Sequence, residues 1–260
     1  MVFRAASQNP CRRGLVGWAL LVVALALGPV AARAAETSVA VAANFTEPAR
    51  EIAAAFKTAS GHTATLSFGP SGQFYAQISK GAPFEVLLSA DVERPQKAEQ
   101  EGLGVAGTRF TYAVGRLVLY SKTPGLIDKR GAVLTSDRFQ KLAIADPTAA
   151  PYGVAAVATL RKLGVFDALK PKIVMGTSIA QAYQFVDTGA AELGFVALSQ
   201  VIATPGGSRW LVPAADHPAI DQQAILLKTG QDNLAARAFL AFLKSPAAIA
   251  IIRKYGYEIR

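Results

Sequence analysis

The pattern of apolar residues along the chain switches repeatedly between the period of a strand and the period of a helix. Residues 37–43 form a β-like run, and residues 48–58 follow with the spacing of an amphipathic helix. Residues 63–68 alternate as a strand before a turn at 69–72, and a short helix follows that turn. Further strands are expected at 86–89, 112–121, 142–145, 173–175, 193–197, 210–212 and 224–227. Further helices are expected at 95–101, 154–163, 179–186, 233–243 and 247–255.

This order of elements predicts an α/β protein. Strands separated by helices need right-handed crossovers onto a mainly parallel sheet, and 260 residues are enough for two such sheets. Ligands of such proteins bind beyond the carboxyl ends of the strands, where the next helices begin. The four clearest junctions of this kind are at residues 43–46, 70–72, 151–153 and 178–180.

The first 34 residues have the composition of a signal peptide. Arg4, Arg12 and Arg13 form a basic start, residues 14–31 carry no charge, and small residues occupy positions 32 and 34. We expect cleavage after Ala34. The alternative is a retained membrane anchor, because the apolar run approaches the length of about 18 residues at which spanning begins.

Charge and cysteine usage change once this segment is removed. The segment contains four of the 27 basic residues and none of the 18 acidic residues, so 23 basic residues remain against 18 acidic ones. These are scattered, which favours a solvated surface over a nucleic-acid groove. The single cysteine, Cys11, lies within the segment. The mature chain would therefore have no thiol for catalysis, metal binding or disulfides, which suits an oxidising exported compartment.

The four junctions share a chemistry that suits an anion. None contains Lys, Arg or His, but each helix start offers free backbone N–H groups and the positive end of the helix dipole. Asn44 and Ser71 add side-chain donors. Each junction on its own is equally explained as a helix cap or turn, since Ser, Thr and Asn commonly cap helices. The spacing alone does not identify the site.

Six stretches of the chain, in this order and spacing, resemble the periplasmic molybdate-binding proteins, which are the solute receptors of molybdate ABC importers. The resemblance covers essentially the whole mature chain. The stretches are residues 39–45, 68–78 and 81–91, then 145–147 with 151–153, then 193–197 and 242–248.

The resemblance implies a two-lobe type II periplasmic-binding-protein fold. Each lobe would be a mainly parallel sheet flanked by helices, and two crossovers would join the lobes. The first lobe would comprise residues 35–115 and 223–260, and the second residues 116–222. A hinge role would fall on the return crossover around 210–222.

Carried over by position, the oxyanion contacts fall on Asn44 and Ser71 in the first lobe and on the backbone N–H groups of Tyr152 and Ile179 in the second. Two positions depart from relatives. Ala43 has no hydroxyl where some relatives have Thr, and Ala197 replaces a Tyr that supplies a hydroxyl in others. The number of donors is therefore open.

The donor chemistry favours molybdate and tungstate as ligands. Both are proton-free dianions that only accept hydrogen bonds, whereas phosphate retains a proton near pH 7 and needs an acceptor. The junctions offer no carboxylate except Glu47 just beyond the first. Asp146 ends a nearby strand, and we interpret it as a turn former because Pro147 follows it. Sulfate, also a bare dianion, stays open as a ligand.

An enzyme is the alternative from a different class. His62 and His217 leave a periplasmic hydrolase possible, although Ser71 lacks the Gly-x-Ser-x-Gly elbow. No metal-site pattern occurs in the sequence, and two histidines without cysteine argue against a zinc site. We therefore expect a monomeric receptor that has no cofactor and no metal ligands. Its partners would be the oxyanion and a permease in the inner membrane.

Overall fold

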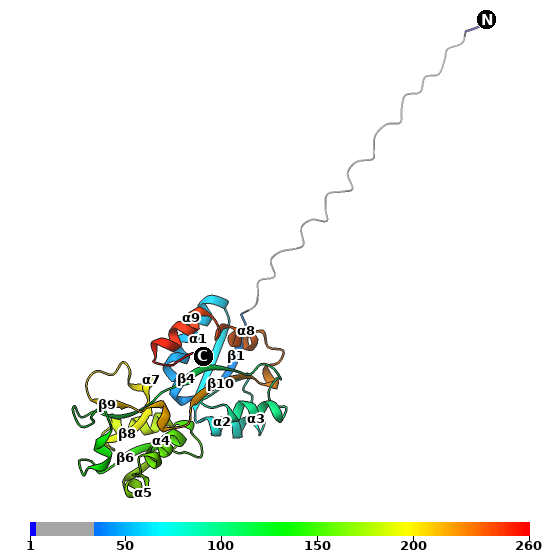
Figure 1. Cartoon of the computed structure of the whole chain (residues 1–260). Coiled ribbons are helices and arrows are strands. Elements are labelled where there is room, and N and C mark those ends of the chain that lie inside the picture. Colours follow the sequence, from blue (N-terminus) through cyan, green and yellow to red (C-terminus); the bar gives the residue numbers. More distant parts are fainter. Residues whose placement is uncertain (4–33) are drawn as a thin grey trace. The chain divides into compact units, whose positions relative to one another are not determined.

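The chain builds two five-stranded sheets, each with helices on both faces (Figure 1). The computed structural model describes residues 1–3 and 34–260, so most of the predicted signal peptide lies outside the described residues. The strand order in the first sheet is β2 (Thr63–Gly69), β1 (Glu36–Ala42), β3 (Val86–Ser89), β10 (Ile220–Leu226), β4 (Phe110–Gly115). The strand order in the second sheet is β7 (Ile173–Gly176), β6 (Leu142–Ala145), β8 (Leu193–Ala197), β5 (Leu117–Ser121), β9 (Ser208–Leu211). Each sheet is the centre of one lobe, which confirms the predicted two-lobe α/β architecture.

The first sheet combines strands from both ends of the described chain. Strand β1 (Glu36–Ala42) pairs in parallel with β2 (Thr63–Gly69) and with β3 (Val86–Ser89). Strand β10 (Ile220–Leu226) runs antiparallel between β3 and β4 (Phe110–Gly115). The first lobe is therefore completed by residues that follow the whole of the second lobe.

The second sheet uses only the middle of the chain. Strand β6 (Leu142–Ala145) is parallel to β7 (Ile173–Gly176) and to β8 (Leu193–Ala197). Strand β5 (Leu117–Ser121) is antiparallel to β8 and to β9 (Ser208–Leu211). Both sheets are thus mixed, but four of the five strands in each run in the same direction. The reversed strand, β10 in the first sheet and β5 in the second, is the one that follows a crossover between the lobes.

The single strand predicted at 112–121 is two strands in two different sheets. Strand β4 ends at Gly115 and β5 begins at Leu117, so the chain crosses between the lobes at Arg116. Apolar residues continue without interruption on both sides of this crossing, which is why the pattern predicted one long strand. At Gly115 a Cβ atom would lie only 2.2 Å from the phenol oxygen of Tyr152, so the crossing requires glycine.

Alternating residues of the first sheet feed two separate apolar layers. Val39 and Val41 of β1 pack with α1 (Thr46–Ser60), α8 (Leu234–Phe242) and α9 (Pro246–Lys254). The intervening residue Ala40 faces the layer formed by α2 (Ser71–Ile78). Helix α3 (Glu93–Gln100) packs beside α2, and Figure 1 shows this pair on the opposite side of the sheet from α8 and α9. This alternation is the strand period expected from the sequence.

Helix starts in the second lobe lie at the predicted junctions. Helix α4 (Pro151–Lys162) begins with proline at its first position, three residues before the predicted start. Helix α6 (Ile179–Asp187) is capped by Ser178, whose hydroxyl accepts the Gln181 N–H at 3.2 Å. Several short elements were not predicted, because one turn has no recognisable period. They are α5 (Phe166–Leu169), α7 (Leu198–Val201), and the 3-10 turns η1 (Ala43–Phe45), η2 (Ala132–Thr135), η3 (Lys170–Lys172), η4 (Ala214–Asp216) and η5 (Lys228–Gly230).

The end of the chain reinforces the first crossover. Val114 and Glu258 exchange backbone hydrogen bonds of 2.8 and 3.1 Å, and the Arg116 guanidinium pairs with the Glu258 carboxylate. On the return path, β10 begins at Ile220, which lies within the range expected for the hinge. The predicted lobe boundaries stay a prediction.

Among the described helices, none is by itself long and apolar enough to cross a membrane. Only the bent pair of α8 and α9 reaches that length together.

Candidate functional site

The four residues expected to contact a ligand, Asn44, Ser71, Tyr152 and Ile179, line one small cavity between the lobes. The other lining residues are small or apolar. Among the described residues around this cavity, none carries a charged side chain. The remaining lining residues are Ala42, Ala43, Gly69, Pro70, Ala90, Ala150 and Pro151.

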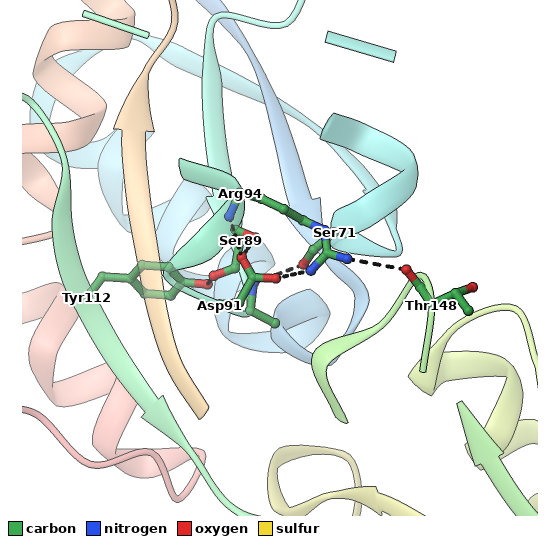
Figure 2. Close-up of polar contacts among 7 residues, drawn as sticks. Ser71, Ser89, Asp91, Arg94, Tyr112 and Thr148 are labelled. Atoms are coloured by element: carbon green, nitrogen blue, oxygen red, sulfur yellow. Dashed lines mark hydrogen bonds and ion pairs between the residues drawn. The ribbon is translucent and has the colours of Figure 1, made fainter. Parts of the chain in front are cut away.

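Ser71 is positioned by the start of α2. Pro70 is extended, with φ −68° and ψ 140°, and Ser71 is the first helical residue. The side chain is buried, and its oxygen accepts the N–H of Ala90 at 3.0 Å (Figure 2). Because that bond uses a lone pair, the hydroxyl hydrogen is left to donate to an acceptor in the cavity. Ser71 can therefore supply both a hydroxyl and a backbone N–H.

The Asn44 side chain does not point its donors at the cavity, contrary to our expectation. Its Nδ2 donates to Gln222 Oε1 and to the Tyr257 hydroxyl, both at 2.9 Å, which uses both amide hydrogens. The backbone carbonyl oxygen of Asn44 accepts hydrogen bonds from Ser199 Oγ at 2.8 Å and from the Tyr257 hydroxyl at 2.7 Å. The backbone N–H of Asn44 lies in the first turn of η1, where it has no partner within the turn, so this group can donate to a ligand.

Tyr152 and Ile179 present backbone N–H groups from the second lobe. They are the second residue of α4 and the first residue of α6, and both are buried. N–H groups in the first turn of a helix have no partner within the helix, and the helix dipole places positive potential there. Within the described chain, neither N–H donates to another protein group. Together with the first lobe, they converge on the cavity from two sides.

A buried polar cluster lies behind the cavity and includes the Tyr152 phenol. Gln222 Oε1 accepts from the Tyr112 hydroxyl at 3.0 Å, and Gln222 Nε2 donates to the Tyr152 oxygen at 3.4 Å. Burial raises the pKa of Tyr112 and Tyr152 well above the ordinary phenol value, and raises the pKa of Tyr257 to about 12. All three phenols are therefore neutral hydrogen-bonding groups near neutral pH.

The carboxylates that could have upset an anion site lie elsewhere. Asp146 accepts the backbone N–H of Thr148 at 2.9 Å and its hydroxyl at 2.8 Å, which is the turn role predicted for it. Glu47 pairs loosely with Arg50, and neither carboxylate lines the cavity. The cavity consequently offers hydrogen-bond donors and, among its described lining side chains, no negative charge.

Of the other residues singled out from the sequence, one lines the cavity and the rest lie away from it. Ala43 lines the cavity, whereas Ala197 is fully buried and its N–H donates to Gln200 Oε1 at 2.9 Å. Neither His62 nor His217 lines the cavity, and the His62 ring accepts the Ala35 N–H at 3.1 Å. Within residues 1–3 and 34–260, no three His, Cys, Asp or Glu side chains come together as potential metal ligands.

Two residues beside the cavity were not recognised from the sequence. Asp91 pairs with Arg94 three residues later. Gly72, the second residue of α2, donates its N–H to Ala149 O of the second lobe at 3.0 Å. The Asp-x-x-Arg spacing at the start of α3 was a usable signal for the ion pair. Nothing in the sequence indicated the contact between Gly72 and Ala149, whose partners are 77 positions apart.

The chain is similar to known solute-binding proteins. Residues 37–258 match the family of bacterial extracellular solute-binding proteins. The molybdate-binding protein ModA of Rhodobacter capsulatus is 58% identical over 237 residues, covering 91% of this chain and 92% of the relative. The ModA of Azotobacter vinelandii is 55% identical, covering 92% and 97%. The solved structure of the periplasmic molybdate-binding protein of Azotobacter vinelandii superposes with a TM-score of 0.84 at 41% identity, covering 86% and 99%.

Proposed function

Because the chain belongs to the family of bacterial extracellular solute-binding proteins, we propose that it is a periplasmic receptor that binds molybdate between its lobes and delivers it to an ABC importer. The observation that carries this proposal is the set of four helix starts, two from each lobe, around one uncharged cavity. The names of the most similar relatives supply the identity of the oxyanion.

The donors divide between the lobes. In the first lobe, the Ser71 hydroxyl and the backbone N–H groups of Ser71 and Asn44 would contact the ligand. In the second, the contacts would come from the backbone N–H groups of Tyr152 and Ile179. A dianion that only accepts hydrogen bonds is fully satisfied by such a ring. Because none of the described residues lining the cavity is charged, no buried cation would be left unpaired when the ligand leaves.

Lobe movement would couple binding to delivery. Oxyanion bound to one lobe gains its remaining donors only when the other lobe closes over it, so the ligand favours the closed state by differential contact. Release would follow when the permease favours the open state. Tungstate has the same charge, shape and hydrogen-bonding capacity as molybdate, and we expect it to bind as well.

Four finer expectations form part of the same proposal. The protein would act as a monomeric receptor and not as an enzyme, it would reach the periplasm through its N-terminal segment, and the cleavage site would lie near Ala34. A sulfate receptor is the alternative within the class, because sulfate is also a proton-free dianion. A hydrolase has less support, since neither histidine lines the cavity.

Calorimetry separates these ligands. The protein purified from the periplasm is titrated with molybdate, tungstate, sulfate and phosphate at one pH and ionic strength. We expect one site with heat for molybdate and tungstate, and none for phosphate. Ligand at about 1,000 times its dissociation constant should stabilise the fold by about 4 kcal/mol, which a melting shift detects. Binding of sulfate but not of molybdate would establish the alternative. No binding of any of the four anions would refute the proposal.

A further inference from the structure

A second set of contacts joins the lobes beside the cavity. The loop before α4, at residues 146–150, supplies two backbone acceptors to the first lobe. Ala149 O accepts the Gly72 N–H at 3.0 Å, and Thr148 O accepts from the Arg94 guanidinium at 3.3 Å (Figure 2). These bonds connect a loop of one lobe to helices of the other, so they require the lobes to be together.

Contacts within the first lobe hold the Arg94 side chain in position for this interaction. Its guanidinium pairs with the Asp91 carboxylate, and the Asp91 Oδ1 atom also accepts the Arg94 backbone N–H at 3.1 Å and the Ser89 hydroxyl at 3.0 Å. The two charged side chains are only 18% and 16% exposed. Figure 2 shows the guanidinium between Asp91 and Thr148, so one branch serves the ion pair while the other reaches across.

The same backbone segment also supports the oxyanion site. Ala90 lies between Ser89 and Asp91, lines the cavity, and donates its N–H to the Ser71 hydroxyl. On the other lobe, Thr148 and Ala149 are followed by Ala150, which lines the cavity as well. Arg94 itself does not line it. The contact with Thr148 is therefore adjacent to the bound ligand without touching it.

Resting on the proposed function, we propose that Arg94 is a positioning residue that bridges the closed lobes and slows release of the bound oxyanion. Asp91 fixes the guanidinium in the first lobe, and the bond to Thr148 O forms only after the second lobe has closed. An interaction made after closure lengthens the bound lifetime and leaves the rate of encounter nearly unchanged.

The test uses two substitutions that separate the role of the second guanidinium branch from the role of the positive charge. Arg94→Lys keeps a cation beside Asp91 but lacks the second branch, whereas Arg94→Gln removes the charge as well. The matched control is Arg109→Lys. Arg109 pairs with Glu99 at 3.0 Å and is similarly shielded at 27% exposure, but all its bonds stay within the first lobe. Each protein is loaded with labelled molybdate, and loss of label is followed during a chase with unlabelled molybdate.

We expect both Arg94 variants to release molybdate about 3- to 10-fold faster, the loss of roughly one hydrogen bond. Their association rates and the release rate of Arg109→Lys should stay near those of the unsubstituted protein. Faster release from Arg94→Gln alone would assign Arg94 to charge compensation of Asp91 and overturn the bridging role. Unchanged release from both would also overturn it.

Stability and ligand controls keep the outcomes distinct. Thermal unfolding without ligand is measured for each variant, and if Arg94→Gln does not fold, Arg94→Lys carries the test, with unchanged release again refuting the role. If the unsubstituted protein binds no molybdate, the proposed function fails and this inference fails with it. Normal molybdate binding with unaltered release from the folded Arg94 variants overturns the inference alone.

Discussion

Replacing Gly72 by alanine should weaken oxyanion binding without lowering the stability of the free protein. A Cβ atom at this position would lie 3.1 Å from Ala149 O, 3.2 Å from Ala149 Cα and 3.1 Å from the Arg94 guanidinium. Two of these three atoms belong to the backbone of the opposite lobe. The methyl group therefore resists closure, while in the open receptor it meets no opposing lobe.

The magnitude follows from how the strain can be relieved. Each contact is a few tenths of an ångström too short, and the easiest relief is a slight opening of the cleft. That movement stretches the 3.0 Å bond between Gly72 and Ala149 and the 3.3 Å bond between Arg94 and Thr148. Overpacking and the loss of a hydrogen bond each cost about 1 kcal/mol or more, so binding should lose about 1–2 kcal/mol. The dissociation constant should rise about 5- to 30-fold.

Calorimetry with molybdate measures the affinity, and thermal unfolding without ligand measures the stability. Gly72 is the second residue of a helix, where alanine is at least as favourable as glycine, so the melting temperature of the free protein should not fall. Gln73→Ala is the control, because Gln73 is the next residue of the same helix and is exposed. An unchanged dissociation constant for Gly72→Ala would refute the close approach of the lobes as a condition of binding.

Three further predictions concern the site and the cluster behind it. Ser71→Ala should weaken molybdate binding by about 1–3 kcal/mol in calorimetry, and it should also lower the melting temperature because the Ala90 N–H loses its acceptor. Tyr152→Pro deletes a backbone N–H and should weaken molybdate binding strongly. Tyr152→Phe should cost only the weak 3.4 Å hydrogen bond from Gln222. Equal losses of affinity in the two variants, measured by titration, would assign the ligand contact to the phenol. Burial raises the pKa of Tyr257 from 10.0 to about 12, so its stabilising effect is complete below pH 10 and is lost as the pH rises toward 12. Melting curves across this range should show the decline, and it should be shallower in Tyr257→Phe, where Tyr112 and Tyr152, whose phenol pKa burial also raises, still contribute.

Local signals in the sequence were sufficient to find the elements that line the cavity. Strand ends followed by helix starts are visible in periodicity and capping residues, and all four predicted junctions meet at the cavity. The reason is topological, since the ends of parallel strands in each lobe lie at the same edge of a sheet. The choice of molybdate depended on the family resemblance, because donor type alone does not distinguish molybdate from sulfate.

Side-chain partners that are distant in the sequence could not be predicted. The Asn44 amide is occupied by Gln222 and Tyr257, which are 178 and 213 positions away. The break at Gly115 was missed for a similar reason: the phenol that excludes a side chain there belongs to Tyr152, in the other lobe. In both cases the local pattern was correct, and a contact formed only in the folded chain determined the outcome.

The way the first sheet is assembled affects the order in which the protein can fold. All strands of the second sheet come from one continuous segment between Leu117 and Leu211, so that half has its complete set of partners early. Strand β4 has no such independence, because its partner β10 follows the whole second lobe in the sequence. The first sheet should therefore be completed only when the C-terminal segment has joined it. Pulsed hydrogen exchange during refolding should protect β6 before β4.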